Sequence, residues 1–139
     1  MKKKNLGNKR ILIVDQNPEI LKFLEEETRK IGVIYQFEKA DTFPQAVDSI
    51  LSGQYDLVIL DFPGIRGPYL LNLAVLREIP VVLLVSINFF SFEAHHLLEK
   101  RIMGLLPKEN LSEIIPVIEN LLSQKSSSDP PGGSKDVIS

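Results

Sequence analysis

The chain of 139 residues has no cysteine, no long hydrophobic run and no excess of basic charge. Without cysteine there are no disulfides, no thiolate metal sites and no thiol nucleophiles. A formal net charge of −2 provides no overall basic field that would indicate nucleic-acid binding. The first ten residues are basic, but the apolar stretch behind them, Ile11–Val14, is too short for a signal peptide or a membrane span. We therefore expect a cytoplasmic protein that binds neither nucleic acid nor membrane.

What the chain does contain is enough apolar sequence for one folded domain. Hydrophobic residues make up 44% of the chain, which is far from a disordered composition. Residues from about 123 onward are rich in Ser, Pro and Gly instead. We predict a basic flexible N-terminus over 1–8, a folded domain over 9–122, and a disordered tail or truncated linker over 123–139.

Strand-like and helix-like segments alternate along this domain. We expect strands at about 10–15, 33–37, 57–60, 80–85 and 103–106, and helices at about 18–31, 42–52, 68–77, 91–100 and 110–122. The start of the last helix lies at Asn110 or Ser112, and Ser112 as its cap puts Pro116 in or beside the first turn. Alternation of this kind predicts a doubly wound (βα)5 fold, a flavodoxin-like three-layer α/β sandwich with a five-stranded parallel sheet.

Two acids stand at the ends of predicted strands. Asp15 follows the apolar run Ile11–Val14, and Asp61 follows Leu57–Leu60 just before Pro63 and Gly64 end that strand. Open α/β sheets bind ligands at the carboxyl ends of their strands. Bringing two carboxylates together there is costly unless a cation or a reaction uses them.

The order of these markers resembles the receiver domain of bacterial response regulators, from about Lys9 to Leu122. Acids end the first and third strands in "ILIVDQNP" and "YDLVILD", the latter followed by "PGIRG". A hydroxyl residue ends the fourth strand in "PVVLLVS", and a lysine follows the fifth in "GLLPKENLSE". No single marker is specific, whereas four in order are fairly specific.

The resemblance implies a role for each marker. Asp61 is the expected phosphoacceptor, and Asp15 and Asp61 are the expected Mg²⁺ ligands, with the backbone carbonyl of Pro63 as a third. Lys108 and Ser86 are expected to contact the phosphoryl group. Without the resemblance, Asp61 and Asp15 are interpreted as loop or helix-capping acids. Ser86 would then only end its strand, and Lys108 would be a surface lysine. These alternatives stay open.

Three positions depart from the family's pattern. Gln16 stands where receivers usually have a second acid that binds the metal, so we expect Mg²⁺ binding to be weakened by about tenfold or more. Pro63 follows the acceptor by two residues rather than four, so the loop must take another path. Leu105 stands where many receivers have an aromatic switch residue.

We therefore weigh two functions. The first is a receiver that is phosphorylated on Asp61 by a histidine kinase or phosphotransfer protein and signals to an unknown downstream protein. The second is a pseudo-receiver, a phosphorylation-independent interaction module, which Gln16 and the short loop favour. An enzyme is not expected, because an aspartate-nucleophile phosphatase would need a general acid two residues after its nucleophile, at position 63, where this chain has a proline.

For partner binding we assign Phe89, Phe92 and Leu105, because receivers contact partners at this end of the domain. Receiver-like domains often pair through their last helices, so a homodimer is an open alternative. The adjacent residues His95 and His96 point about 100° apart on a helix and cannot chelate a metal together.

Overall fold

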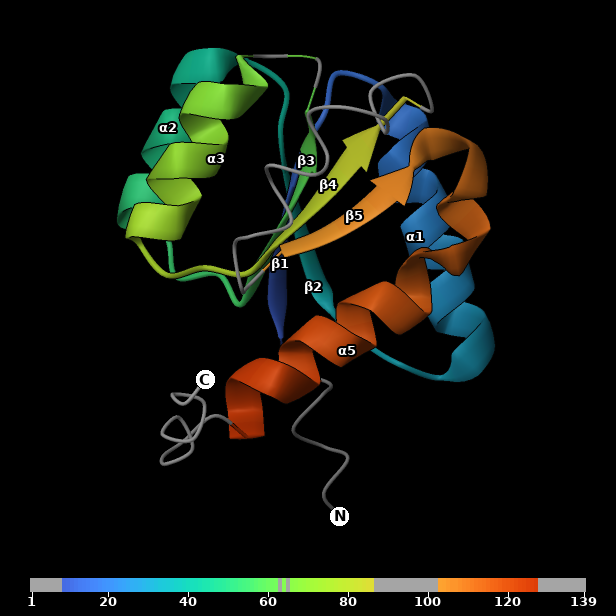
Figure 1. Ribbon diagram of the computed structural model, residues 1–139. Helices are drawn as coiled ribbons and strands as arrows, with labels where there is room; N and C mark the ends of the chain where they lie inside the picture. Colours follow the sequence, from blue (N-terminus) through green and yellow to red (C-terminus); the bar gives the residue numbers. More distant parts are fainter. Residues whose placement is uncertain (1–8, 63, 65, 87–102, 128–139) are drawn as a thin grey trace.

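A parallel sheet in the strand order β2-β1-β3-β4-β5 runs through the centre of the computed structural model, which describes residues 9–62, 64, 66–86 and 103–127 (Figure 1). The strands are β1 (Arg10–Val14), β2 (Gln36–Ala40), β3 (Leu57–Asp61), β4 (Val81–Val85) and β5 (Met103–Pro107). The helices are α1 (Pro18–Ile31), α2 (Phe43–Ser52), α3 (Gly67–Leu76), the 3₁₀ helix η2 (Lys108–Glu113) and α5 (Ile114–Ser127).

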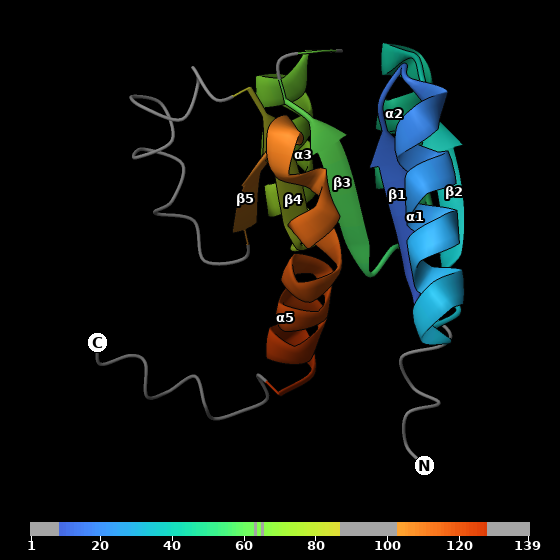
Figure 2. The ribbon, with the colours of Figure 1, turned by 90° about the vertical axis from the view of Figure 1, so that its right-hand side faces the viewer.

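Helices cover both faces of this sheet. Figure 2 shows α1 and α5 on one face, with α2 and α3 on the other. Each face has its own hydrophobic cluster: β-strand residues such as Ile13 and Ile59 pack with α1 and α5, while Val14 and Leu60 pack with α2 and α3. Burial on both faces explains why β1, β3 and β4 are nearly continuous aliphatic runs. The predicted doubly wound α/β sandwich with five parallel strands is confirmed.

Helix ends follow the signals in the sequence. The side chain of Asn17 accepts a hydrogen bond from the Glu19 N–H at the start of α1, and Gly32 ends that helix in the left-handed region. Thr42 caps α2 in the same way as Asn17, by accepting from the Gln45 N–H. These caps satisfy backbone groups that have no partner inside a helix.

Two predicted boundaries are wrong. The second strand was expected at 33–37 but lies at Gln36–Ala40, because β2 pairs along the whole of β1, from Arg10 opposite Gln36 to Val14 opposite Ala40. The last helix was expected to begin at Asn110 or Ser112 and to end at Leu122, but α5 runs from Ile114 to Ser127 after a separate 3₁₀ turn. Pro116 still falls in the first turn of α5, where its missing N–H would have no partner in any case.

The helix predicted at 91–100 lies outside the described residues. Among the helices that the structure does describe, none has the length and apolar character needed to cross a membrane.

Candidate functional site

The four predicted site residues lie at the carboxyl ends of four strands, along one edge of the sheet. Asp15 directly follows β1, Asp61 is the last residue of β3, Ser86 follows β4, and Lys108 follows β5 as the first residue of η2. Because all five strands are parallel, their carboxyl ends lie together at one edge of the sheet, where the strand arrows in Figure 1 end. Val85 pairs with Pro107 at the end of the β4–β5 ladder, so Ser86 and Lys108 leave the sheet at the same level.

Lys108 and Asp61 form an ion pair. The Lys108 Nζ lies 2.7 Å from Asp61 Oδ1, and the lysine side chain is 42% exposed while the aspartate side chain is 15% exposed. β4 lies between β3 and β5, so the lysine reaches across the end of a strand to meet the acid. This Oδ1 is buried. The ammonium therefore neutralises the carboxylate charge at close range.

Asp15 belongs to the same electrostatic environment. It is only 4% exposed, and its Oδ1 accepts a hydrogen bond from the Asn17 N–H at 2.8 Å. Burial raises the pKa of Asp15, and the negative charge of Asp61 adds to this rise, while the Asn17 N–H and the charge of Lys108 oppose it. The two acids and the lysine thus influence one another, as their predicted convergence requires.

The loop after Asp61 folds back over its carboxylate. Gly64 donates its N–H to the Asp61 carbonyl oxygen at 3.1 Å, and a Cβ added at Gly64 would lie 2.9 Å from Asp61 Oδ2. A glycine at this position therefore keeps space open beside the carboxylate. Pro63, whose carbonyl was predicted as a metal ligand, lies outside the described residues.

Several solved structures have the same arrangement of strands and helices. The signal receiver domain of an HD domain-containing protein from Pseudomonas fluorescens matches with a TM-score of 0.70 and 25% identity, over 87% of this chain and 99% of that one. A CheY-like response regulator receiver domain protein from Methanospirillum hungatei matches with a TM-score of 0.68 and 23% identity, over 85% of this chain and 96% of that one. The chain has the fold of a response regulator receiver domain.

A third receiver domain bears on the metal question. It belongs to a sensor histidine kinase from Pseudomonas aeruginosa, and it matches with a TM-score of 0.65 and 21% identity, over 84% of this chain and 98% of that one. Its structure has a magnesium ion coordinated in the active site cleft. Neither a protein-family model nor a curated protein matches the chain, so the likeness to receivers is carried by three-dimensional structure.

The residues of this receiver fold suit a hard cation with few protein ligands. Asp15 and Asp61 supply carboxylate oxygens, and Asp61 Oδ1, which the Lys108 ammonium contacts, is buried. Gln16 is exposed, and the described residues contain no cluster of three or more Asp, Glu or His that could hold a metal. Mg²⁺ binds through one or two carboxylates and keeps several waters. The donor set fits Mg²⁺ with one acid fewer than the family's usual pattern.

Lys39 is a charged neighbour of the site that the sequence analysis missed. It lies on β2 opposite Ile13 of β1, its side chain is 24% exposed, and its charge opposes the rise in the pKa of Asp15 that burial causes. The predicted second strand ended at residue 37, so position 39 was not seen as the end of a strand. The signal that could have found it is the alternation over 36–40, which places Phe37 and Lys39 on the same face.

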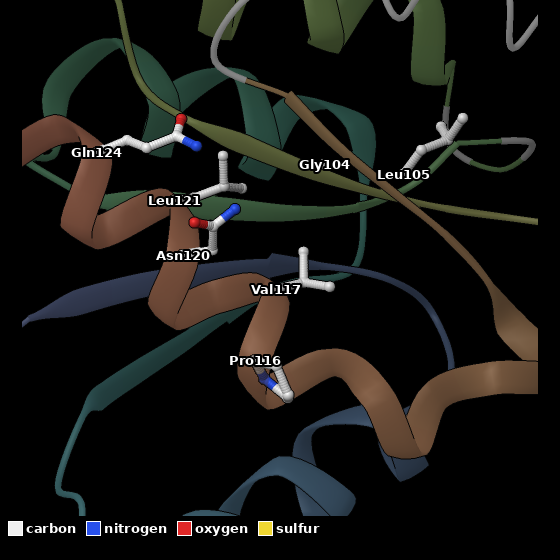
Figure 3. A pocket seen from close by; sticks show the side chains of 7 residues that line it. All are labelled: Gly104, Leu105, Pro116, Val117, Asn120, Leu121 and Gln124. Atoms are coloured by element: carbon white, nitrogen blue, oxygen red, sulfur yellow. The ribbon is translucent and has the colours of Figure 1, made fainter.

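The partner-binding prediction can be placed for Leu105 alone, because Phe89 and Phe92, as well as His95 and His96, lie outside the described residues. Leu105 is half-buried in β5 and packs against the core on the α2–α3 side of the sheet. Its backbone borders an open hollow of about 370 Å³ between β5 and α5 (Figure 3). The amides of Asn120 and Gln124 line the other wall, and none of the strand-end markers takes part.

Proposed function

We propose that this chain is a receiver domain of two-component signalling, which accepts a phosphoryl group on Asp61 in the cytoplasm and signals through protein contacts. The observation that carries the proposal is the 2.7 Å contact between Lys108 and Asp61 beside the buried Asp15. Charged side chains from the ends of three strands meet at the sheet edge where α/β folds place their chemistry.

The proposed reaction is a phosphoryl transfer to a carboxylate. An oxygen of Asp61 attacks the phosphorus of a phosphohistidine on a histidine kinase or phosphotransfer protein. The new bond joins that oxygen to phosphorus, the phosphorus–nitrogen bond breaks, and the imidazole nitrogen leaves with the electron pair and takes up a proton. The products are an aspartyl phosphate and a neutral histidine.

The chain's own residues stabilise the charge that this transfer moves. Lys108 already neutralises Asp61, and its flexible, partly exposed side chain is free to follow the phosphoryl oxygens as they replace the carboxylate charge. Asp15 and Asp61 would hold Mg²⁺, which when bound supplies further neutralisation of the phosphoryl oxygens. Ser86, level with Lys108, would donate a hydrogen bond to the aspartyl phosphate.

Formation of that hydrogen bond is the proposed switch. A phosphoryl group that Ser86 and Lys108 both contact would draw the ends of β4 and β5 toward Asp61. A local change of charge would thereby bias a two-state segment that a downstream protein can recognise. Leu105, on β5 close to Lys108, and the predicted contacts Phe89 and Phe92 are the proposed partner-binding residues.

Intact-mass measurement tests the proposal directly. The protein is incubated with a small-molecule phosphodonor and millimolar Mg²⁺, and Asp61→Asn serves as the control. We expect one phosphoryl group on the wild type and none on Asp61→Asn. The same added mass on both proteins would mean that another residue is the acceptor.

The alternative function is a pseudo-receiver that binds a partner without phosphoryl chemistry. Gln16 favours it, because the site has a neutral, exposed amide where an acid would bind the metal. The ion pair with Lys108 also neutralises Asp61 without a metal. If intact-mass measurement finds no added mass on the wild type at high concentrations of phosphodonor and Mg²⁺, the pseudo-receiver is favoured over the phosphorylated receiver.

A further inference from the structure

The helix α3 is apolar nearly all round although part of it is exposed. Its ten residues, Gly67–Leu76, contain no charged side chain. Leu70, Leu71 and Ala74 are buried against the sheet, but Tyr69 is 51% exposed and Leu76 is 79% exposed. A helix that is apolar on every side is normally enclosed by other parts of a protein or by a partner.

The neighbouring helix α2 extends this apolar area. α2 and α3 run side by side in the same direction on one face of the sheet (Figure 1). Phe43, Val47 and Leu51 follow one another at intervals of four residues along one side of α2, and Leu51 is 45% exposed. The rings of Phe43 and Tyr69 meet edge to face with centroids 5.5 Å apart, so the two helices form one continuous surface.

We call this the α2–α3 surface. Its members are Phe43, Val47 and Leu51 of α2 and Tyr69, Leu73 and Leu76 of α3. Neither helix contains a lysine or a glutamate, which are depleted at protein interfaces, and Asp48 is the one charged residue within the two helices.

Charges of opposite sign lie at the margins of the surface. Arg66 and Arg77 stand at the two ends of α3, and neither forms an ion pair with a described residue. The Arg66 guanidinium is held over the Phe43 ring at 4.5 Å and near the Tyr69 ring at 5.6 Å. Of the acids of α2, the exposed Asp41 precedes the helix, with its Oδ2 4.0 Å from the Lys39 Nζ, and the exposed Asp48 lies within it.

We infer that the α2–α3 surface binds a second copy of this chain about a twofold axis parallel to the two helices. Such an axis places α2 of one copy opposite α3 of the other, with both pairs running in the same direction. Arg66, at the start of α3, then faces the partner's Asp41, and Arg77 lies on the side of the partner's Asp48. The apolar rows meet in the centre, and Tyr69 and the two arginines are of residue types enriched among those that contribute most to binding.

The charges argue for a second copy rather than another protein. A twofold contact requires one patch to be complementary to itself, with each sign placed where the rotation brings the opposite sign. Arginines along α3 and aspartates along α2 satisfy that requirement. The inference is independent of phosphoryl transfer, so it is tested on unmodified protein without phosphodonor or Mg²⁺.

Sedimentation equilibrium of the full chain over a concentration series provides the test. We expect a reversible monomer–dimer equilibrium that Leu76→Asp weakens by more than about tenfold in Kd, since a charge replaces the most exposed leucine of the surface. Ile34→Asp is the matched control. Ile34 is 72% exposed, but it follows α1 on the other face of the sheet, so its variant should dimerise like the wild type.

A charge exchange tests the orientation. Arg66→Asp and Asp41→Arg should each weaken the dimer, and the double variant should restore at least part of the lost affinity because the pair is re-formed with reversed signs. Circular dichroism melting of each variant shows that the fold is retained.

Two results would overturn the inference. The first is a wild type that stays monomeric at every concentration; if its melting temperature also drops sharply in Leu76→Asp but not in Ile34→Asp, the chain itself covers the α2–α3 surface. The second is a dimer that Leu76→Asp leaves intact, which would place the contact on another surface.

Discussion

Lys108 and Asp61 show how single side chains can join strands that are not neighbours. The lysine begins η2 after β5, the aspartate ends β3, and β4 separates the two strands. Only the long, flexible stem of lysine allows the ammonium to come within 2.7 Å of the carboxylate while remaining 42% exposed. Such a charge can move from the carboxylate to an incoming phosphoryl group without rearranging the core.

Replacing Lys108 by alanine should therefore impair chemistry and leave the fold intact. We expect phosphorylation by a small-molecule donor, followed by intact mass over time, to slow by about 100-fold, as when one preorganised charge-stabilising group is lost. Lys30→Ala is the control, because Lys30 forms only an exposed ion pair with Glu27 on α1. Equal rates in wild type and Lys108→Ala would remove Lys108 from the proposed mechanism.

Gln16 is the residue at which the site departs most from the receiver pattern. It is exposed next to the buried Asp15, so an acid there could reach a metal held by Asp15 and Asp61. We expect Gln16→Asp to tighten Mg²⁺ binding by about tenfold, since another carboxylate is added next to a dication. Calorimetric or fluorescence titration measures this, and an unchanged affinity would show that the path of the loop after Asp61 limits binding instead.

At the level of elements, the connection from β3 to α3 depends on close backbone approach. A Cβ added at Gly67 would lie 1.9 Å from the carbonyl oxygen of Phe62, and Arg66 beside it has a positive φ of 49°. The rings of Phe43 and Tyr69 hold the Arg66 guanidinium, which helps to keep this unusual backbone in place. The turn thereby brings the loop after Asp61 into contact with the start of α2.

We expect Gly67→Ala to lower the free energy of unfolding by about 3 kcal/mol, because the added methyl group forces the backbone apart. Gly32→Ala is the matched control. Gly32 has a positive φ of 77° and open space around its Cβ position, so its replacement should carry a conformational cost of about 1 kcal/mol and no clash. Urea denaturation measures both, and equal losses would mean that the clash at Gly67 is relieved by a small shift.

At the scale of the whole molecule, the buried carboxylate of Asp15 lowers the free energy of unfolding. Burial raises the pKa of Asp15 above its ordinary value of 3.8. A carboxyl group whose pKa is higher in the folded state binds protons more tightly there than in the unfolded state. Stability therefore falls as the pH rises through the interval between 3.8 and the raised pKa.

Asp15→Asn should consequently be more stable than the wild type at neutral pH without divalent cations, by about 1 kcal/mol. The amide keeps an oxygen for the Asn17 N–H and removes the buried charge. The difference in the free energy of unfolding between Asp15→Asn and the wild type should disappear as the pH falls below 3.8. At neutral pH, Mg²⁺ should reduce this difference, because it binds the folded wild type more tightly than the variant. Denaturation curves over a pH series measure this, and a variant less stable than the wild type at neutral pH would contradict it.

The sequence alone determined the order of the strands and helices that the structure describes, because strand and helix periods, capping residues and strand-ending acids are local signals. Asn17, Gly32 and Thr42 mark helix ends in the structure as they do in the sequence. Asp15 and Asp61 could be chosen in advance, since parallel strands bring their carboxyl ends to one edge, and the resemblance to receiver domains added Lys108. Where local signals were weak, at the edge strand β2 and at the start of α5, the boundaries were wrong.

Only the tertiary structure decided how these elements lie against one another. The register of β2 on β1 brought Lys39 beside Asp15, which no pattern of spacing along the chain specifies. The packing of α2 on α3 brought Phe43, Arg66 and Tyr69 together from separate segments. Contacts of this kind depend on side chains far apart in the sequence, and their geometry is set by packing of the whole sheet and its helices rather than by any local preference.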